Sequence, residues 1–114
     1  MTYPLKKKKP SSANAIRELS DFIVSLDKGC YLEKIITKAK EKLLDNMFSG
    51  EPVQKKLIPR YYIQRYDLNN LYVLDLDSSR RLSYTLLHNG IGVAVILLEV
   101  FLTHKEYEKK FGYT

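Results

Sequence analysis

The chain has 114 residues, enough for one domain with a substantial core but too few for two. Nineteen Lys+Arg against thirteen Asp+Glu give a formal net charge of +6, which favours a polyanion or an acidic protein partner, unless this is a small basic protein that binds neither. The single cysteine, Cys30, excludes an intramolecular disulfide, so we expect a cytoplasmic protein. The longest apolar run, 91–98, is far shorter than the ~20 residues that span a bilayer, so we expect no membrane segment.

Residues 1–12 form a basic start to the chain that is interrupted by Pro and Ser and contains four consecutive lysines, Lys6 to Lys9. Because no apolar stretch follows the lysines, this segment is not expected to be a signal peptide. We interpret it as a flexible basic arm or at most a short edge strand. The folded domain is expected to occupy residues 13–114.

Two amphipathic helices are predicted next. The first has either Ser12 or Asn14 as its N-cap and places apolar residues at helical spacing: Ile16, Leu19, Phe22, Ile23 and Leu26. Gly29 is expected to end this helix, since glycine adopts the left-handed cap conformation cheaply. The second helix has lysines opposite an apolar stripe of Leu32, Ile35, Ile36, Ala39, Leu43, Leu44 and Met47. Together they form a helical hairpin whose apolar faces need a partner surface.

The segment 53–70 follows a turn at 49–52 and has no clear period. Its basic residues are Lys55, Lys56, Arg60 and Arg65, and they flank a pair of tyrosines at 61 and 62. Because Pro59 excludes a central strand position, we interpret the segment as an irregular or edge segment with a basic and aromatic surface.

Three strands are predicted in the last third of the chain, at 71–76, 80–86 and 93–101, with turns at 77–79 and 88–90. Such short turns indicate that the strands pair antiparallel in sequence order. The third is almost wholly apolar and is predicted to be the central strand, covered on both faces. Residues 105–111 indicate a short helix or turn. The predicted fold is α+β: an N-terminal helical hairpin packed on one face of a small antiparallel sheet.

Arg81 and His104 are the candidate catalytic residues. Arg81 follows Arg80 in a strand, so the two side chains point to opposite faces. A guanidinium at the open face or rim can hold a phosphate through two parallel hydrogen bonds, although pairing with Asp75 or Asp77 across the turn is an equal alternative. His104 follows the last strand and can act as an acid or base near neutral pH, or it is only a surface residue.

Tyrosines supply the aromatic part of the predicted site. Tyr84 and Tyr107 can stack on unpaired bases or donate to a phosphate oxygen, and the alternative for each is a place in the core. No Gly-rich phosphate loop, serine nucleophile elbow or metal-ligand spacing occurs in the sequence, so we expect neither a cofactor nor a metal. Phosphoryl transfer would then use the 2′-hydroxyl of RNA as the nucleophile, with cationic and acid–base side chains stabilising the developing charge.

Two short motifs give a resemblance to a known family. Arg81-Leu82-x-Tyr84 in the middle strand and Thr103-His104-x-Glu106-Tyr107 after the last strand resemble the RelE/ParE toxin superfamily of toxin–antitoxin systems, over roughly residues 14–113. The resemblance implies a compact microbial-ribonuclease-like fold. It also implies a RelE-type toxin that cleaves messenger RNA on the ribosome and is silenced by a small cognate antitoxin protein.

The resemblance assigns roles to individual residues. Arg81 matches the strand arginine that binds the scissile phosphate, His104 matches a C-terminal histidine used in acid–base catalysis, and Tyr107 matches a tyrosine that contacts substrate or takes part in proton transfer. Residues expected to bind messenger or ribosomal RNA are Lys55, Lys56, Arg60, Arg65, Arg80 and Tyr84.

The sequence also departs from the family pattern. RelE-type toxins place catalytic lysines on the strand that here carries Val73 and Asp75, and the position before Arg81, usually aromatic, is Arg80. These departures leave open a ParE-like DNA gyrase inhibitor, or a toxin that has lost catalysis and acts only as a protein-binding module.

Overall fold

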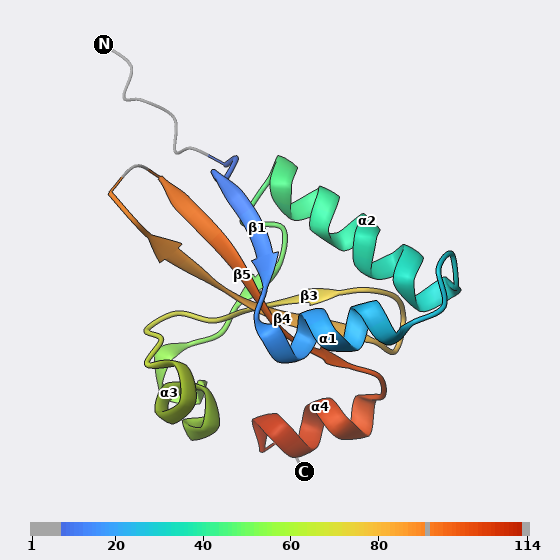
Figure 1. The fold of residues 1–114 in the computed structure, drawn as a ribbon. Coiled ribbons are helices and arrows are strands. Elements are labelled where there is room, and N and C mark those ends of the chain that lie inside the picture. Colours follow the sequence, from blue (N-terminus) through green and yellow to red (C-terminus); the bar gives the residue numbers. More distant parts are fainter. Residues whose placement is uncertain (1–7, 91, 113–114) are drawn as a thin grey trace.

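The computed structural model describes residues 8–90 and 92–112, in which helices pack on both faces of one sheet (Figure 1). Residues 1–7, which hold most of the predicted basic arm, and Tyr113 lie outside the described residues. The elements in chain order are β1 (Ser12–Ala15), α1 (Arg17–Ser25), α2 (Tyr31–Asp45), β2 (Glu51–Pro52), η1 (Lys55–Leu57), α3 (Arg60–Tyr66), β3 (Tyr72–Asp75), β4 (Arg81–His88), β5 (Val93–Phe101) and α4 (His104–Phe111).

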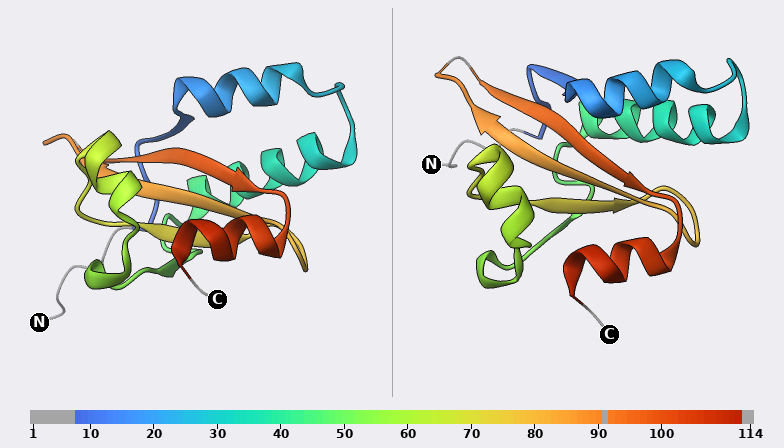
Figure 2. Two further views of the ribbon diagram at one scale, coloured as in Figure 1. Left: turned by 90° about the horizontal axis from the view of Figure 1, so that it is seen from below. Right: turned by 60° about the horizontal axis from the view of Figure 1, so that its bottom comes forward.

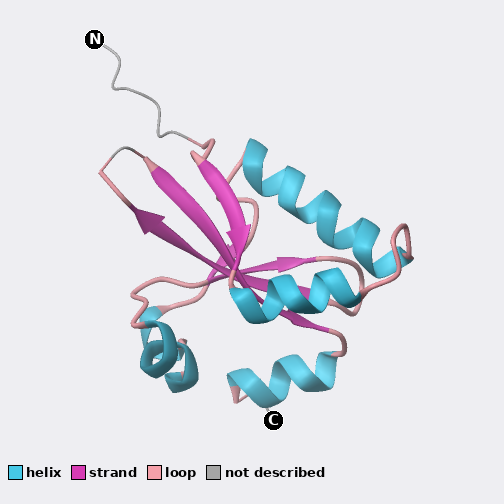
Figure 3. Ribbon diagram, viewed as in Figure 1, coloured by secondary structure: helices cyan, strands magenta, loops and turns pink. Residues whose placement is uncertain are grey.

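The sheet is mixed, and its strand order is β1-β5-β4-β3-β2. Figure 3 shows its strands in magenta among the cyan helices. The predicted antiparallel pairing of β3, β4 and β5 is confirmed, with Arg81 opposite both Asp75 and Phe101. The prediction of a wholly antiparallel sheet is wrong, because β1 runs parallel to β5 and pairs with residues 94–97. Strand β5 is internal and well buried, but β4 occupies the middle position.

The predicted helical hairpin exists, but it is not the first element of the fold. Strand β1 precedes it, so Ser12 and Asn14 lie in a strand and cannot cap α1, whose N-cap position is Ile16. Hydrogen bonds to β5 explain this, because Ser11 donates its backbone N–H to Val93 and Ile16 donates to Leu97. This parallel backbone pairing with β5 outweighs the local capping preference of Ser12 and Asn14.

Helices α3 and α4 cover the face of the sheet opposite α1 and α2 (Figure 2). The expectation that 53–70 is irregular is wrong for 60–66, which form α3 directly after Pro59. Tyr62 decides this, because it is fully buried against the sheet and holds a short helix that has little local preference. Helix α4 begins with a capping box in which Thr103 accepts from the backbone N–H of Glu106.

The sheet separates two hydrophobic clusters, and alternate strand residues enter each. Leu82, Tyr84 and Leu86 face α1 and α2, whereas Leu98 and Phe101 face α3 and α4. A bulge at Ser83/Tyr84 changes the register with β5, so that Ser83 lies opposite Glu99 and Tyr84 opposite Leu97. None of the helices in the described part of the chain combines the length and apolarity needed to cross a membrane.

Candidate functional site

Arg81 lies at the start of β4, on the sheet face covered by α4. Its guanidinium carbon is 4.3 Å from the centre of the Tyr107 ring, and its Nε is 3.2 Å from an Asp75 oxygen. The ring and the carboxylate fix the plane of the guanidinium. The side chain of Arg81 is 27% exposed to solvent and that of Asp75 is 76% exposed, so the two form a surface ion pair. Such a pair is weak, and an incoming phosphate can compete with Asp75 for the guanidinium. Of the two alternatives for Arg81, the structure shows the pairing with Asp75, and phosphate binding by its partly exposed guanidinium stays a prediction.

Arg80 points to the opposite face, as the strand period predicts. It donates to Asp77 at 2.8 Å and lies over the ring of Tyr31 at the start of α2. Backbone N–H groups of Ser79 and Arg80, together with the Arg80 side chain, hold the pKa of Asp77 well below its usual range. Arg80 therefore closes the β3–β4 turn and does not join Arg81, so the structure does not place it in the predicted RNA-binding set.

His104 and Tyr107 both lie on α4 but in different environments. His104 is the first residue of the helix and is exposed, with its Nδ1 4.0 Å from a Glu108 oxygen. Tyr107 is buried, packs edge-on against Phe101 and stacks on Phe111. The structure thus brings Arg81 and Tyr107 into contact and places His104 one helical turn from that contact.

Tyr84 is buried on the other face of the sheet. Its hydroxyl donates to the Met47 carbonyl at 2.8 Å and accepts from the Gly50 N–H at 3.0 Å, and its ring stacks on Tyr72. Burial raises the pKa of Tyr84 to about 12, and the Gly50 hydrogen bond opposes this in part. With no exposed surface, this ring is not accessible to a nucleobase, so the prediction that Tyr84 binds RNA is wrong for this conformation.

The other predicted RNA-binding cations gather near α3. Lys55 and Lys56 lie in η1, Arg60 begins α3, and all three are exposed. Arg65 is exposed too, but it forms an ion pair with Glu18 at 3.1 Å. These four residues lie on η1 and α3, and α3 covers the same face of the sheet as α4, the face that carries Arg81.

The structure reveals a polar cluster, Glu99, Tyr62, Lys110 and Ser83, that sequence reasoning missed. The Tyr62 hydroxyl donates to Glu99 Oε1 at 2.7 Å and lies 3.0 Å from the Ser83 hydroxyl, while Lys110 Nζ is 3.6 Å from Glu99 Oε2. Burial raises the pKa of Tyr62, so its phenol stays protonated as a donor. Glu99 is the only charged residue in the otherwise apolar strand 93–101, and this isolated carboxylate is the sequence feature that could have indicated the cluster.

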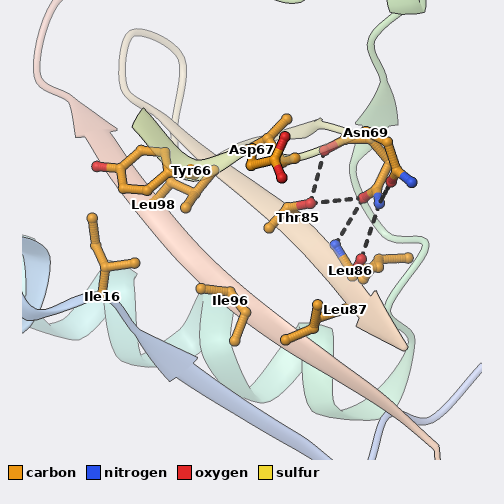
Figure 4. Close-up of a pocket in the computed structure, with 11 residues that line it drawn as sticks. Ile16, Tyr66, Asp67, Asn69, Thr85, Leu86, Leu87, Ile96 and Leu98 are labelled. Carbon is orange, nitrogen blue, oxygen red and sulfur yellow. Dashed lines mark hydrogen bonds between the residues drawn. The ribbon is translucent and has the colours of Figure 1, made fainter. Parts of the chain in front are cut away.

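Two hollows of similar size lie on this side of the sheet. One, of about 400 Å³, is lined by Glu99, Phe101, Lys109 and Lys110 with their neighbours at β5 and α4. The other, of about 390 Å³, lies between the 67–70 loop and strands β4 and β5 (Figure 4). Polar groups in its lining already hydrogen-bond to one another. The Asn70 side chain makes hydrogen bonds to the backbone of Leu86 and to the hydroxyl of Thr85. None of the predicted catalytic residues lines this second hollow.

Chemically, the α4 face combines a partly exposed guanidinium, an imidazole, an oriented carboxylate and an ammonium group. Within residues 8–90 and 92–112, no three His, Cys, Asp or Glu side chains are grouped as metal ligands. No protein-family model, curated protein or solved structure matches this chain. The resemblance to the RelE/ParE superfamily therefore remains a prediction from the motifs.

Proposed function

We propose that this protein is a metal-independent endoribonuclease of the RelE type, a toxin that acts in the cytoplasm on ribosome-bound message and is restrained by a cognate antitoxin. The observation that carries the proposal is the pairing of Arg81 with the Tyr107 ring, 4.3 Å apart, at the end of the sheet where α4 begins with His104. This arrangement offers a pre-oriented phosphate ligand beside a group that can transfer protons at neutral pH.

In the proposed reaction Arg81 stabilises charge on the phosphorane that forms when the 2′-hydroxyl attacks phosphorus. A guanidinium held in place before the reaction needs little reorganisation as that charge develops, which is the source of electrostatic catalysis. His104 acts as the acid or base, and Tyr107 orients Arg81. Lys55, Lys56 and Arg60 are exposed and unpaired with any carboxylate in the described ranges, so they are available to bind the RNA backbone.

Primer extension on message from a translating extract tests the proposal, comparing wild type with Arg81→Ala and His104→Ala. We expect discrete new RNA ends with wild type, and a loss of at least about 100-fold with Arg81→Ala, as removal of one oxyanion-stabilising donor produces. Arg17→Ala is the matched control, because Arg17 is an exposed arginine at the start of α1. Absence of cleavage with and without ribosomes would refute the ribonuclease proposal.

The second candidate is a protein-binding toxin, a ParE-like gyrase inhibitor or a degenerate ribonuclease. The pairing of Arg81 with Asp75 favours it, because the carboxylate offsets the charge that a phosphate would need. A salt series on ribosome binding separates the two candidates. Contacts to many phosphates give a steep fall of log affinity with log salt, which a gyrase contact need not give.

A further inference from the structure

We propose that Tyr61 is a stacking platform for an unpaired base of the RNA strand, whose phosphates are held by the cations of η1, α3 and α4; this inference rests on the proposed function for its substrate class. The segment 55–66 contains four cations and three tyrosines and no Asp or Glu. Cations interleaved with aromatic rings are typical of surfaces that bind single-stranded nucleic acid, because the cations follow the backbone and every base has a flat face that can stack.

Tyr61 is exposed, whereas the tyrosine next to it in the sequence is completely buried. Tyr62 has no exposed surface, and Tyr61 is 44% exposed. The Tyr61 ring nevertheless packs nearly at right angles on two others, with ring centres 5.6 Å from Tyr62 and 6.2 Å from Tyr66. These contacts fix the ring while a large part of the residue stays open to a ligand. A ring that is ordered before binding loses little conformational entropy when a base stacks on it.

Positive charge surrounds the Tyr61 ring. Lys110 of α4 places its Nζ 3.5 Å from the centre of the ring, and Arg65 lies one helical turn away on α3. Lys56 and Arg60 are exposed and form no ion pair with a carboxylate in the part of the chain that the structure describes. The carboxylates of an acidic peptide would satisfy the cations alone. A nucleotide satisfies both the cations and the ring, since it joins a phosphate to a flat base.

Lys110 links the stacking platform to the Arg81 site. Helices α3 and α4 cover the same face of the sheet (Figure 2), and the contact of Lys110 with Tyr61 joins them. Tyr107, which contacts Arg81, precedes Lys110 by three residues, a rise of about 4.5 Å along the helix. A single RNA strand can therefore place one phosphate at Arg81 and a nearby base on Tyr61. Bases in a duplex are already stacked on one another, so the platform selects unpaired RNA.

Replacing Tyr61 by tryptophan tests the platform by fluorescence, because the chain contains no tryptophan. The variant Tyr61→Trp keeps a flat ring and introduces a single indole that can be excited selectively. The probe is a short single-stranded RNA that carries 2′-O-methyl groups, which remove the attacking hydroxyl and so prevent cleavage. We expect this RNA to quench the indole strongly through stacking. An abasic strand with the same number of phosphates should bind at least about fivefold more weakly and cause little quenching.

Filter binding of the same RNA at one salt concentration measures the contribution of the ring. Tyr61→Ala should bind about 5- to 150-fold more weakly than wild type, the range for one stacked base. Tyr61→Phe keeps the ring and should bind within about twofold of wild type. Tyr31→Ala is the matched control, because Tyr31 is 58% exposed but lies on α2, on the opposite face of the sheet. This distant change should leave the affinity within about twofold of wild type.

The outcomes separate this inference from the function it rests on. Absence of quenching by RNA that Tyr61→Trp binds, equal quenching by the abasic strand, or equal affinity of wild type and folded Tyr61→Ala overturns the stacking platform and leaves the ribonuclease standing. Stronger quenching by polyglutamate than by RNA also overturns it and assigns the surface to an acidic protein. If circular dichroism shows that Tyr61→Ala is unfolded, the quenching of Tyr61→Trp decides the question. Quenching by RNA, without cleavage of unmodified message by wild type, supports the platform and overturns the ribonuclease.

Discussion

Replacing Tyr84 by Phe tests whether this residue is a structural anchor. The change removes a hydroxyl that donates to Met47 at 2.8 Å and accepts from Gly50 at 3.0 Å, where the chain leaves α2. Each of the two backbone groups left without its partner costs about 1–3 kcal/mol, so we expect a loss of about 2–6 kcal/mol in the free energy of unfolding. For a domain of this size that corresponds to a fall in Tm of about 8–24 °C.

Thermal and urea unfolding followed by circular dichroism measure the loss, and Tyr72→Phe is the matched control. Tyr72 stacks on Tyr84 at 5.2 Å between ring centres, and its hydroxyl makes no hydrogen bond to another residue of the described ranges. Its replacement should cost less than about 0.5 kcal/mol. RNA affinity of folded Tyr84→Phe should equal that of wild type. A Tm within about 2 °C of wild type, or an equal loss in the control, would refute this account of Tyr84.

Four further changes have expected outcomes. Burial raises the folded-state pKa of Tyr84 to about 12, whereas the pKa of an unfolded tyrosine is about 10. The stability that Tyr84 contributes therefore holds up to about pH 10 and falls as the pH rises further. Between pH 9 and 11.5, wild type should lose about 2 kcal/mol of unfolding free energy relative to Tyr84→Phe, measured by urea unfolding. Gly50→Ala places a Cβ 2.8 Å from the Tyr84 ring and 2.8 Å from a β3 carbonyl oxygen, and should cost about 1–3 kcal/mol by the same assay; an unchanged midpoint would contradict the close packing. Thr103→Ala removes the side-chain cap of α4 and should cost about 1 kcal/mol, with faster amide exchange in the first turn of that helix, measured by mass spectrometry. Asp75→Asn removes the carboxylate beside Arg81 and should tighten RNA binding about two- to fivefold in filter binding at low salt, while equal affinity would show that the ion pair does not limit phosphate access.

Local patterns carried the prediction of α1, α2 and the three strands β3, β4 and β5. Helices, strands and the short turns between strands depend mainly on residues close together in the sequence. Apolar residues at 3.6- and 2-residue periods therefore predict them without knowledge of the tertiary contacts. The period of two also predicted that Arg80 and Arg81 point to opposite faces, which their contacts with Tyr31 and Tyr107 confirm.

Elements that depend on distant partners could not be predicted. Strand β1 is only four residues long and gains its hydrogen bonds from β5, at the other end of the chain. Helix α3 lacks an apolar stripe and is held by the burial of Tyr62, whose hydroxyl finds its partners on β4 and β5. Both are cases in which tertiary contacts override local preference.

The charge, the helical hairpin, the strand meander and the presence of Arg81, His104 and Tyr107 near one end of the sheet follow from local patterns in the amino-acid sequence. That Tyr84 belongs to the core, that Arg81 contacts Asp75 and Tyr107, and that Glu99 contacts Tyr62 and Lys110 became visible only in the folded chain. These contacts join residues from different elements, so their distances depend on how the helices pack on the sheet and not on any local spacing.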